Sequence, residues 1–155
     1  MSEKDLKDLK VGDIFEIATG KPAIVNEDSM LNDAVEAITQ NETSKKVYVV
    51  DSQGKLKGVI TIETLLRQVG YKAGVRETGM ISFFKFLGGV FKENVTEFLD
   101  KPITVTKDDF VIEALQKMVE FHLNDLPIID DEYKIIGELH SIEILKHTKN
   151  YFKDE

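Results

Sequence analysis

Apolar positions in the first half of the chain switch repeatedly between strand-like runs and helical spacing. Residues 23–26 form a short apolar run typical of a strand, and residues 31–38 carry apolar side chains on one helical face. Two apolar runs, 47–50 and 56–60, flank a polar turn and predict a hairpin. Residues 63–69 return to helical spacing, so the predicted order is β-α-β-β-α.

The second half repeats this pattern. Residues 103–105 predict the first strand, 111–118 the helix, 127–129 and 135–139 the hairpin, and 142–148 the closing helix. The aligned residues are Pro22, Val25, Asp28 and Ala34 with Pro102, Val105, Asp108 and Ala114, and Asp51, Lys55, Gly58 and Leu66 with Asp130, Lys134, Gly137 and Leu145. Val11–Phe15 and Val95–Leu99 resemble each other as lead-ins to the two copies.

Two copies are too few for a solenoid and indicate a pseudo-twofold pair. One unit of three strands and two helices hides both faces of its sheet poorly, so we expect the two to pack through their sheets. The predicted fold is α/β (α+β), one module over residues 1–155. Its first repeat spans about 10–70, a linker about 71–94, and the second repeat about 95–150.

Composition narrows the function. The chain has 155 residues, 42% hydrophobic and 31% charged, as in a soluble globular protein. The absence of cysteine excludes disulfides and thiolate chemistry, and a net charge of −8 disfavours binding to nucleic acid. The charged start and the lack of a long apolar run predict a cytoplasmic location. No catalytic triad, phosphate loop or zinc spacing is present, so we expect neither catalysis nor a metal.

The motifs at the hairpins resemble a known family. Leu126-Pro127-Ile128-Ile129-Asp130, followed by Gly137 and a helix, is similar to the signature of the cystathionine β-synthase (CBS) domain. Val47-Tyr48-Val49-Val50-Asp51 and Gly58-Val59-Ile60-Thr61 form the first copy, and the resemblance covers roughly Lys10 to Lys149.

This resemblance implies a function. Paired CBS domains, called Bateman modules, bind AMP, ADP, ATP or S-adenosylmethionine between their repeats and regulate an enzyme or transporter. The chain resembles a free-standing module of this kind, commonly a homodimer, with no required cofactor. The alternative is a dimeric interaction scaffold whose nucleotide sites have decayed.

The family's nucleotide signature is Gly-h-h-Thr/Ser-x-x-Asp, in which h is apolar, the carboxylate binds ribose and the hydroxyl faces phosphate. In the first repeat Thr61 fits, but Thr64 stands at the acidic position and Glu63 lies one residue early. In the second repeat His140 replaces the hydroxyl, while Glu143 keeps the acidic position. Neither copy is complete.

The resemblance implies two pockets, each with residues from both repeats. The pocket around Glu143 would contain Ile24, Val25, Asn26, Asn124, Asp125, Leu126, His140 and Glu143. The pocket around Thr61 would contain Lys45, Lys46, Thr61, Thr64, Thr104, Val105 and Thr106. We expect ribose at Glu143, whereas Lys45 and Lys46 favour phosphate in the other pocket.

Each candidate also has a purely structural explanation. Glu143 and Thr61 both suit the first turn of a helix, where they would satisfy free backbone N–H groups. His140 suits the surface or the boundary between repeats, and Lys45 and Lys46 suit a solvated pair before a strand.

The linker contains an aromatic insert with no counterpart before the first repeat. Met80–Phe91 holds four of the nine phenylalanines of the chain. It predicts either a helix packed on the module by its aromatic face or an exposed surface for dimerisation or a partner.

Overall fold

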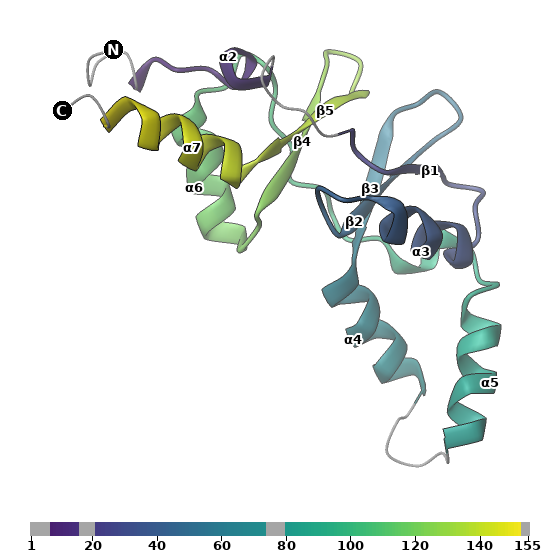
Figure 1. Ribbon diagram of the computed structural model, residues 1–155. Coiled ribbons are helices and arrows are strands. Elements are labelled where there is room, and N and C mark those ends of the chain that lie inside the picture. Colours follow the sequence, from purple (N-terminus) through teal and green to yellow (C-terminus); the bar gives the residue numbers. More distant parts are fainter. Residues whose placement is uncertain (1–6, 16–20, 74–79, 153–155) are drawn as a thin grey trace. The chain divides into compact units, whose positions relative to one another are not determined.

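The computed structural model describes residues 7–15, 21–73 and 80–152. The chain forms two compact units: one consists of residues 22–102, and the other combines residues 1–21 with residues 103–155 (Figure 1). Each unit contains one copy of the repeat. In the described part of the chain, no helix is long and apolar enough to cross a membrane.

The unit of residues 22–102 is built on a three-stranded sheet. Its elements in chain order are β1 (Ile24–Asn26), α3 (Leu31–Gln40), β2 (Lys46–Val50), β3 (Leu56–Thr61), α4 (Ile62–Ala73), α5 (Met80–Val90) and the 3₁₀ helix η1 (Val95–Phe98). The strand order is β1-β2-β3, with β1 parallel to β2 and β2 antiparallel to β3. In this register Lys46 lies opposite Thr61 and Tyr48 lies opposite Val59.

The other unit repeats the arrangement with a two-stranded sheet. Its elements are α2 (Val11–Phe15), α6 (Val111–Phe121), β4 (Asp125–Ile129), β5 (Ile135–His140) and α7 (Ser141–Phe152). Strands β4 and β5 are antiparallel, and Asp125 lies opposite His140. The positions of these elements confirm the predicted hairpin and both predicted helices of the second repeat.

The strand predicted at residues 103–105 is wrong, and Pro127 supplies the reason. In the first repeat the Tyr48 N–H donates to the Ala23 carbonyl at 2.9 Å, which extends the pairing of β1. Pro127 is the counterpart of Tyr48 and has no N–H to donate. The pairing therefore shrinks to a single bridge between Val105 and Ile128, held by the Val105 N–H to the Pro127 carbonyl and the Ile129 N–H to the Val105 carbonyl.

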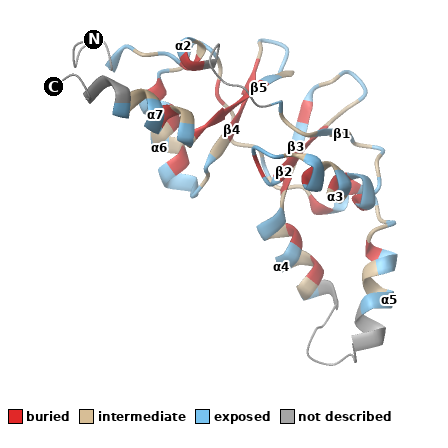
Figure 2. Cartoon of the chain, viewed as in Figure 1, coloured by how far each residue is buried: buried red, intermediate tan, exposed pale blue. Residues whose placement is uncertain are grey.

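Each unit has its own hydrophobic core (Figure 2). The buried core of residues 22–102 consists of Leu31, Ala34, Ile38, Val47, Val49, Ile60, Leu65, Val69, Val90, Val95 and Phe98. The buried core of the other unit consists of Val11, Ile14, Val105, Val111, Ala114, Met118, Leu126, Ile128, Leu139 and Ile144. The helical stripes read from the sequence therefore face these cores.

The two lead-in segments are exchanged between the copies. Val95 and Phe98 of η1 precede the second repeat in sequence, but they are buried in the core with the first repeat. Val11 and Ile14 of α2 precede the first repeat, but they are buried with the second. The compact units therefore differ from the repeats as read along the sequence.

The two hairpin turns share one hydrogen-bonding pattern. The Asp51 carboxylate accepts from the N–H groups of Gln53 and Lys55, and Asp130 accepts equivalently from Glu132 and Lys134, at 2.8–2.9 Å. The backbone hydrogen bond from Lys55, which favours the charged form, lowers the pKa of Asp51. The left-handed position of each turn is Gly54 in the first repeat, with φ of 84°, and Tyr133 in the second, with φ of 64°.

The aromatic insert forms a helix with two kinds of surface. Phe86, Leu87 and Phe91 are partly buried against the core of residues 22–102, whereas Phe84 is 62% exposed. Both interpretations of the insert therefore keep some support. Residues 74–79 of the predicted linker, and the side chains of residues 72–83, lie outside the described part of the chain.

Candidate functional site

The end of β3 and the start of α4 carry the first group of predicted site residues. The Thr61 hydroxyl accepts from the Thr64 N–H at 3.2 Å and lies 2.8 Å from the Thr64 hydroxyl. The Thr64 hydroxyl donates to the Thr61 carbonyl at 3.2 Å. Thr61 is therefore the N-cap of α4, and its hydroxyl already serves the first turn of the helix.

The two lysines of this group lie in different environments. The Lys45 ammonium donates to the Asn41 carbonyl at 3.1 Å from an exposed position. Lys46 is only 8% exposed and lies opposite Thr61 across the hairpin. A solvated pair is therefore the wrong description of Lys46.

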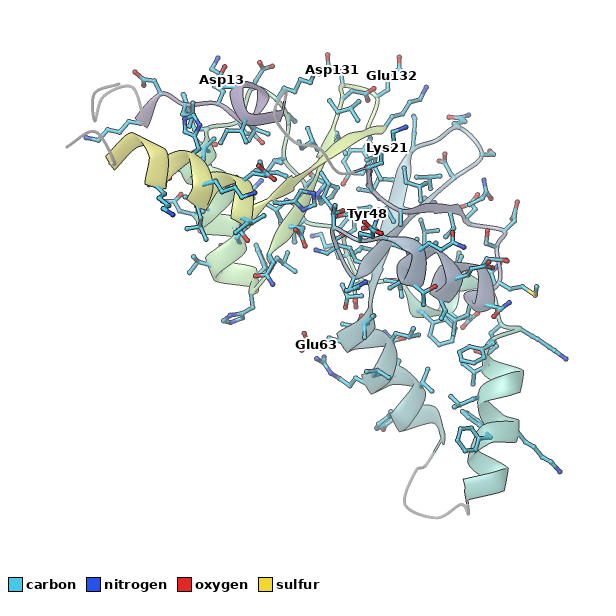
Figure 3. All side chains as sticks on the ribbon, viewed as in Figure 1. Asp13, Lys21, Tyr48, Glu63, Asp131 and Glu132 are labelled. Atoms are coloured by element: carbon cyan, nitrogen blue, oxygen red, sulfur yellow. The ribbon has the colours of Figure 1, made fainter. Side chains whose placement is uncertain are left out.

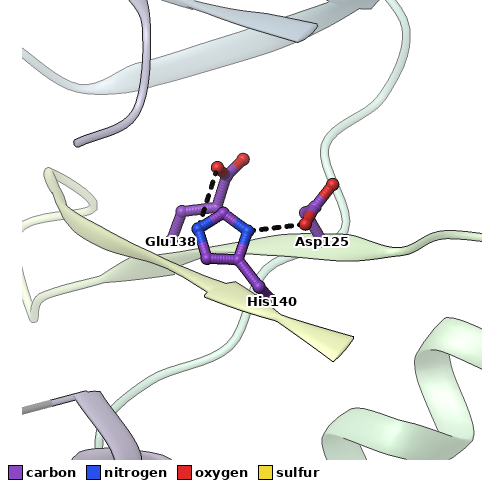
Figure 4. Close-up of side chains that lie close together, drawn as sticks. All are labelled: Asp125, Glu138 and His140. Carbon is purple, nitrogen blue, oxygen red and sulfur yellow. Dashed lines mark hydrogen bonds and ion pairs between the residues drawn. The ribbon is translucent and has the colours of Figure 1, made fainter. Parts of the chain in front are cut away.

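The equivalent end of the second hairpin carries a buried polar cluster (Figure 4). His140 Nδ1 lies 2.6 Å from Asp125 Oδ1, and His140 Nε2 lies 3.6 Å from Glu138 Oε1. The side-chain exposures are 6% for His140, 14% for Asp125 and 0% for Glu138. The interpretation of His140 as a surface residue is therefore wrong.

Electrostatics raise the pKa of His140 above its ordinary value. The hydrogen bond to Asp125 raises the pKa of His140, and the negative charges of Glu138, Asp125 and Glu143 add to this effect. Burial acts in the opposite direction, but the pKa remains above its ordinary value. The cluster thus holds two carboxylates around one imidazole, and the three ligand-type atoms lie within 4.8 Å of one another.

Glu143 lies in the first turn of α7, directly after the end of β5. Its side chain is half-buried, and the Ser141 N–H beside it is already satisfied by the Asn124 carbonyl at 2.8 Å. Glu63, the acidic residue of the first turn of α4, is different: it is 83% exposed and accepts a hydrogen bond from Arg67 at 3.1 Å (Figure 3). The second repeat therefore keeps a sheltered carboxylate that the first lacks.

The remaining predicted site residues are divided between the two units. Leu126 and Val105 have fully buried side chains that belong to a hydrophobic core. The Thr104 carbonyl accepts from the Lys117 ammonium at 2.9 Å. In β1, Ile24 is 44% exposed and Val25 partly buried, while the exposed Asn26 accepts from the Asp28 N–H through its side chain. The structure brings together Asp125 and His140 in one unit and Thr61 and Thr64 in the other.

Glu138 is the residue that the sequence interpretation missed. It occupies an apolar position of the resembled signature, and its counterpart in the first repeat is Val59. A charged residue aligned with a valine inside a predicted strand is the signal that identifies it. Its complete burial next to His140 makes it part of the cluster.

The chain belongs to the CBS domain family. The CBS domain model matches residues 11–71 and 95–150, so the fold and both hairpin–helix junctions fall within it. This finding confirms the resemblance on which the expected fold rested.

The most similar proteins include solved and uncharacterised examples. A CBS domain-containing protein from Thermotoga maritima is 28% identical, with a TM-score of 0.72, covering 90% of this chain and 94% of that one. An uncharacterised protein of Methanocaldococcus jannaschii is 25% identical over 138 residues, 76% of this chain and 80% of its own. A homoserine O-acetyltransferase of Methanosalsum zhilinae is 26% identical over 94% of this chain, which spans only 25% of that enzyme.

Solved proteins of the same fold hold adenosyl ligands. A CBS domain protein from Pyrobaculum aerophilum, 13% identical with a TM-score of 0.64, covers 87% of this chain and 89% of its own and was solved with AMP. A CBS domain pair, 20% identical with a TM-score of 0.63, covers 92% of this chain and 97% of its own and was solved with 5′-methylthioadenosine and S-adenosylmethionine. At these identities the likeness to this chain is one of fold.

Proposed function

We propose that this chain is a regulatory module that binds an adenosyl ligand and passes the occupancy of its site to a partner protein. Membership of the CBS domain family supports this function, as do AMP and S-adenosylmethionine in relatives of the same fold. The partner would be an enzyme or transporter. A regulatory role, not catalysis, is the general property of the family.

The observation that carries the proposal is the placement of Glu143. A half-buried carboxylate in the first turn of α7 has oxygens available for the two hydroxyls of a ribose. At the same position of the first repeat, the Thr64 hydroxyl is already bonded to Thr61. We call the residues at the start of α7 around Glu143 the Glu143 half-site, and those at the start of α4 around Thr61 the Thr61 half-site. The Glu143 half-site is therefore the better ribose acceptor of the two.

Charge favours some adenosyl ligands over others at this half-site. Asp125 and Glu138 lie close to His140, whose pKa is also raised by the nearby charge of Glu143. Like charges repel strongly where solvent is excluded. We therefore expect the cationic S-adenosylmethionine to bind more tightly here than the anionic ATP, with ADP and AMP between them.

Calorimetry and thermal unfolding test this function with AMP, ADP, ATP and S-adenosylmethionine. A ligand present at 100 times its dissociation constant adds about 2.7 kcal/mol to the free energy of unfolding. The variant Glu143→Gln keeps the shape of the side chain and removes its charge, so it should weaken binding at least about tenfold. Glu63→Gln is the matched control, because it changes an exposed first-turn carboxylate of the other repeat.

The outcomes separate the alternatives. Absence of binding by all four ligands contradicts the proposed function. Equal affinities of the wild type and Glu143→Gln would indicate that the ligand binds at the Thr61 half-site.

A second candidate function is a dimeric scaffold that acts through α5. The 62% exposure of Phe84 on a helix otherwise packed by Phe86 and Leu87 favours it. Under this function, Phe84→Glu converts a dimer to a monomer in light scattering, whereas Lys85→Glu on the same helix leaves the mass unchanged. An unchanged mass of Phe84→Glu excludes this surface as the dimer contact.

A further inference from the structure

The cluster of Asp125, Glu138 and His140 has the composition of a metal site. Asp125 lies opposite His140 across the hairpin, and Glu138 lies two residues before His140 on β5, on the same face of the strand. Each residue offers a nitrogen or oxygen that binds divalent cations, and these atoms lie within 4.8 Å of one another. Glu138 is fully buried, which distinguishes the cluster from an ordinary acidic surface.

The imidazole of His140 is oriented for a ligand at Nε2. Its Nδ1 lies 2.6 Å from Asp125 Oδ1, so Nδ1–H donates to that carboxylate. Nε2 is buried, and no group in the described part of the chain forms a hydrogen bond with it. When Nε2 carries no proton, its lone pair can bind a cation, and Glu138 Oε1 lies 3.6 Å away. A metal ion bound to both atoms would take the place of the proton on Nε2.

The distances fit a small divalent ion. Two ligand atoms bound tetrahedrally to Zn²⁺ at about 2.0–2.1 Å lie roughly 3.3 Å apart, close to the observed 3.6 Å between Nε2 and Oε1. A carboxylate that accepts from the other ring nitrogen is a common partner of a metal-binding histidine.

We propose that this cluster binds one divalent transition-metal ion of the Zn²⁺ type. His140 Nε2 and the Glu138 carboxylate are the ligands, and Asp125 orients the imidazole. Water or an external ligand would complete the coordination. This proposal stands independently of adenosyl binding, because it rests on the contacts within one unit.

The first repeat provides an internal comparison. The counterparts of Asp125, Glu138 and His140 are Lys46, Val59 and Thr61. An ammonium, an alkyl group and a hydroxyl that caps α4 do not form a zinc site. The two repeats should therefore give one metal site per chain.

The test is metal binding by the full chain after treatment with a chelator, in the absence of nucleotide. Calorimetric titration with ZnCl₂ should give one ion per wild-type chain. Co²⁺ in its place should give visible absorption bands of a nitrogen–oxygen site. Glu138→Gln, which keeps the shape and removes the charge, should lower the affinity at least about tenfold. Asp125→Asn should lower it about 10- to 100-fold through the orientation of the ring.

The control is His122→Asn, which removes an exposed histidine elsewhere. His122 ends α6 in the left-handed conformation, with φ of 56°, which asparagine tolerates. The affinity of the His122→Asn variant for Zn²⁺ should equal that of the wild type. Lack of stoichiometric uptake by the wild type overturns the proposal, and so does an unchanged affinity in Glu138→Gln. If Glu138→Gln does not fold, the Co²⁺ spectrum of the wild type and Asp125→Asn decide the question.

Discussion

Gly58 offers a direct test of how tightly β3 is packed within its unit. A Cβ added at this residue would lie 2.9 Å from Leu99 Cβ, 3.0 Å from the Asp100 carbonyl oxygen and 3.1 Å from Leu99 Cδ1. Ordinary contacts are longer by roughly half an ångström or more. Two of these three atoms are backbone or Cβ atoms, so a change of rotamer does not relieve the overlap.

The segment that would have to move is held by hydrogen bonds. Val59 N–H donates to the Asp100 carbonyl at 3.1 Å, and Asp100 N–H donates to the Val59 carbonyl at 2.8 Å. Overpacking of this kind costs about 1–3 kcal/mol. Gly58→Ala should therefore lower the midpoint of thermal unfolding by roughly 3–9 °C.

Gly88→Ala is the matched control, because the same methyl group would have no atom within 4 Å. Gly88 lies inside α5, where alanine is more favourable than glycine by about 0.5–1 kcal/mol. The two variants should thus move the midpoint in opposite directions, measured by circular dichroism without ligand. A Gly58→Ala protein as stable as Gly88→Ala would refute the packing argument.

Three further predictions concern pH, the turns and the core. The pKa of His140 is raised on folding, so its contribution to stability is complete below about pH 6.5 and disappears as pH rises through the folded-state pKa. Urea unfolding of metal-free protein should show this loss, and His140→Gln should abolish it. Both turn positions have positive φ, which glycine adopts more readily than alanine or tyrosine. Gly54→Ala should therefore lower the free energy of unfolding by about 1 kcal/mol, whereas Tyr133→Gly should not lower it. Equal losses of stability in the two variants would contradict this reasoning. Ile60→Ala removes a fully buried side chain and should lower the free energy of unfolding by about 2–5 kcal/mol. Ile62 is 38% exposed, so Ile62→Ala should lower it much less. Similar losses in the two variants would contradict the different burial of these residues.

The repeated pattern predicts most of the elements because each depends on local sequence. The helical stripes and the hairpins are local signals, and their turns keep Asp51 and Asp130 with the same hydrogen bonds. The strand at residues 103–105 fails because its pairing depends on the N–H of a residue distant in sequence, and that residue is Pro127. Comparison of Tyr48 with Pro127 in the aligned copies contains this information.

The exchange of the lead-in segments is not predictable from the same pattern. Val11 and Ile14 are apolar, and this fact predicts burial but not which core receives them. The choice depends on contacts such as the Val11 N–H to the Asp109 carbonyl at 2.8 Å, which join residues far apart in sequence. The candidate site is also only partly predictable from the sequence. Alignment of the two copies identifies Asp125 and His140 as candidates, whereas the contribution of Glu138 to the cluster follows only from its burial next to His140.

The differences between the two copies are concentrated at the ends of the hairpins, and they are physically coupled. The buried Glu138 carboxylate lies 3.6 Å from His140, and His140 lies 2.6 Å from Asp125 directly opposite. A change at any one of these three residues therefore alters the electrostatic environment of the other two. At the aligned positions the first copy has no such cluster: it has Val59 and a threonine that caps its own helix.

Opposite charge is the consequence of this coupled divergence. One hairpin end presents Lys46 beside Thr61, and the other presents two carboxylates around an imidazole. If both half-sites bind ligands as proposed, a phosphate should prefer the first arrangement, and a metal ion or a cationic ligand the second. We therefore expect the two half-sites to differ in the class of ligand they select, although the backbone that carries them is the same repeat.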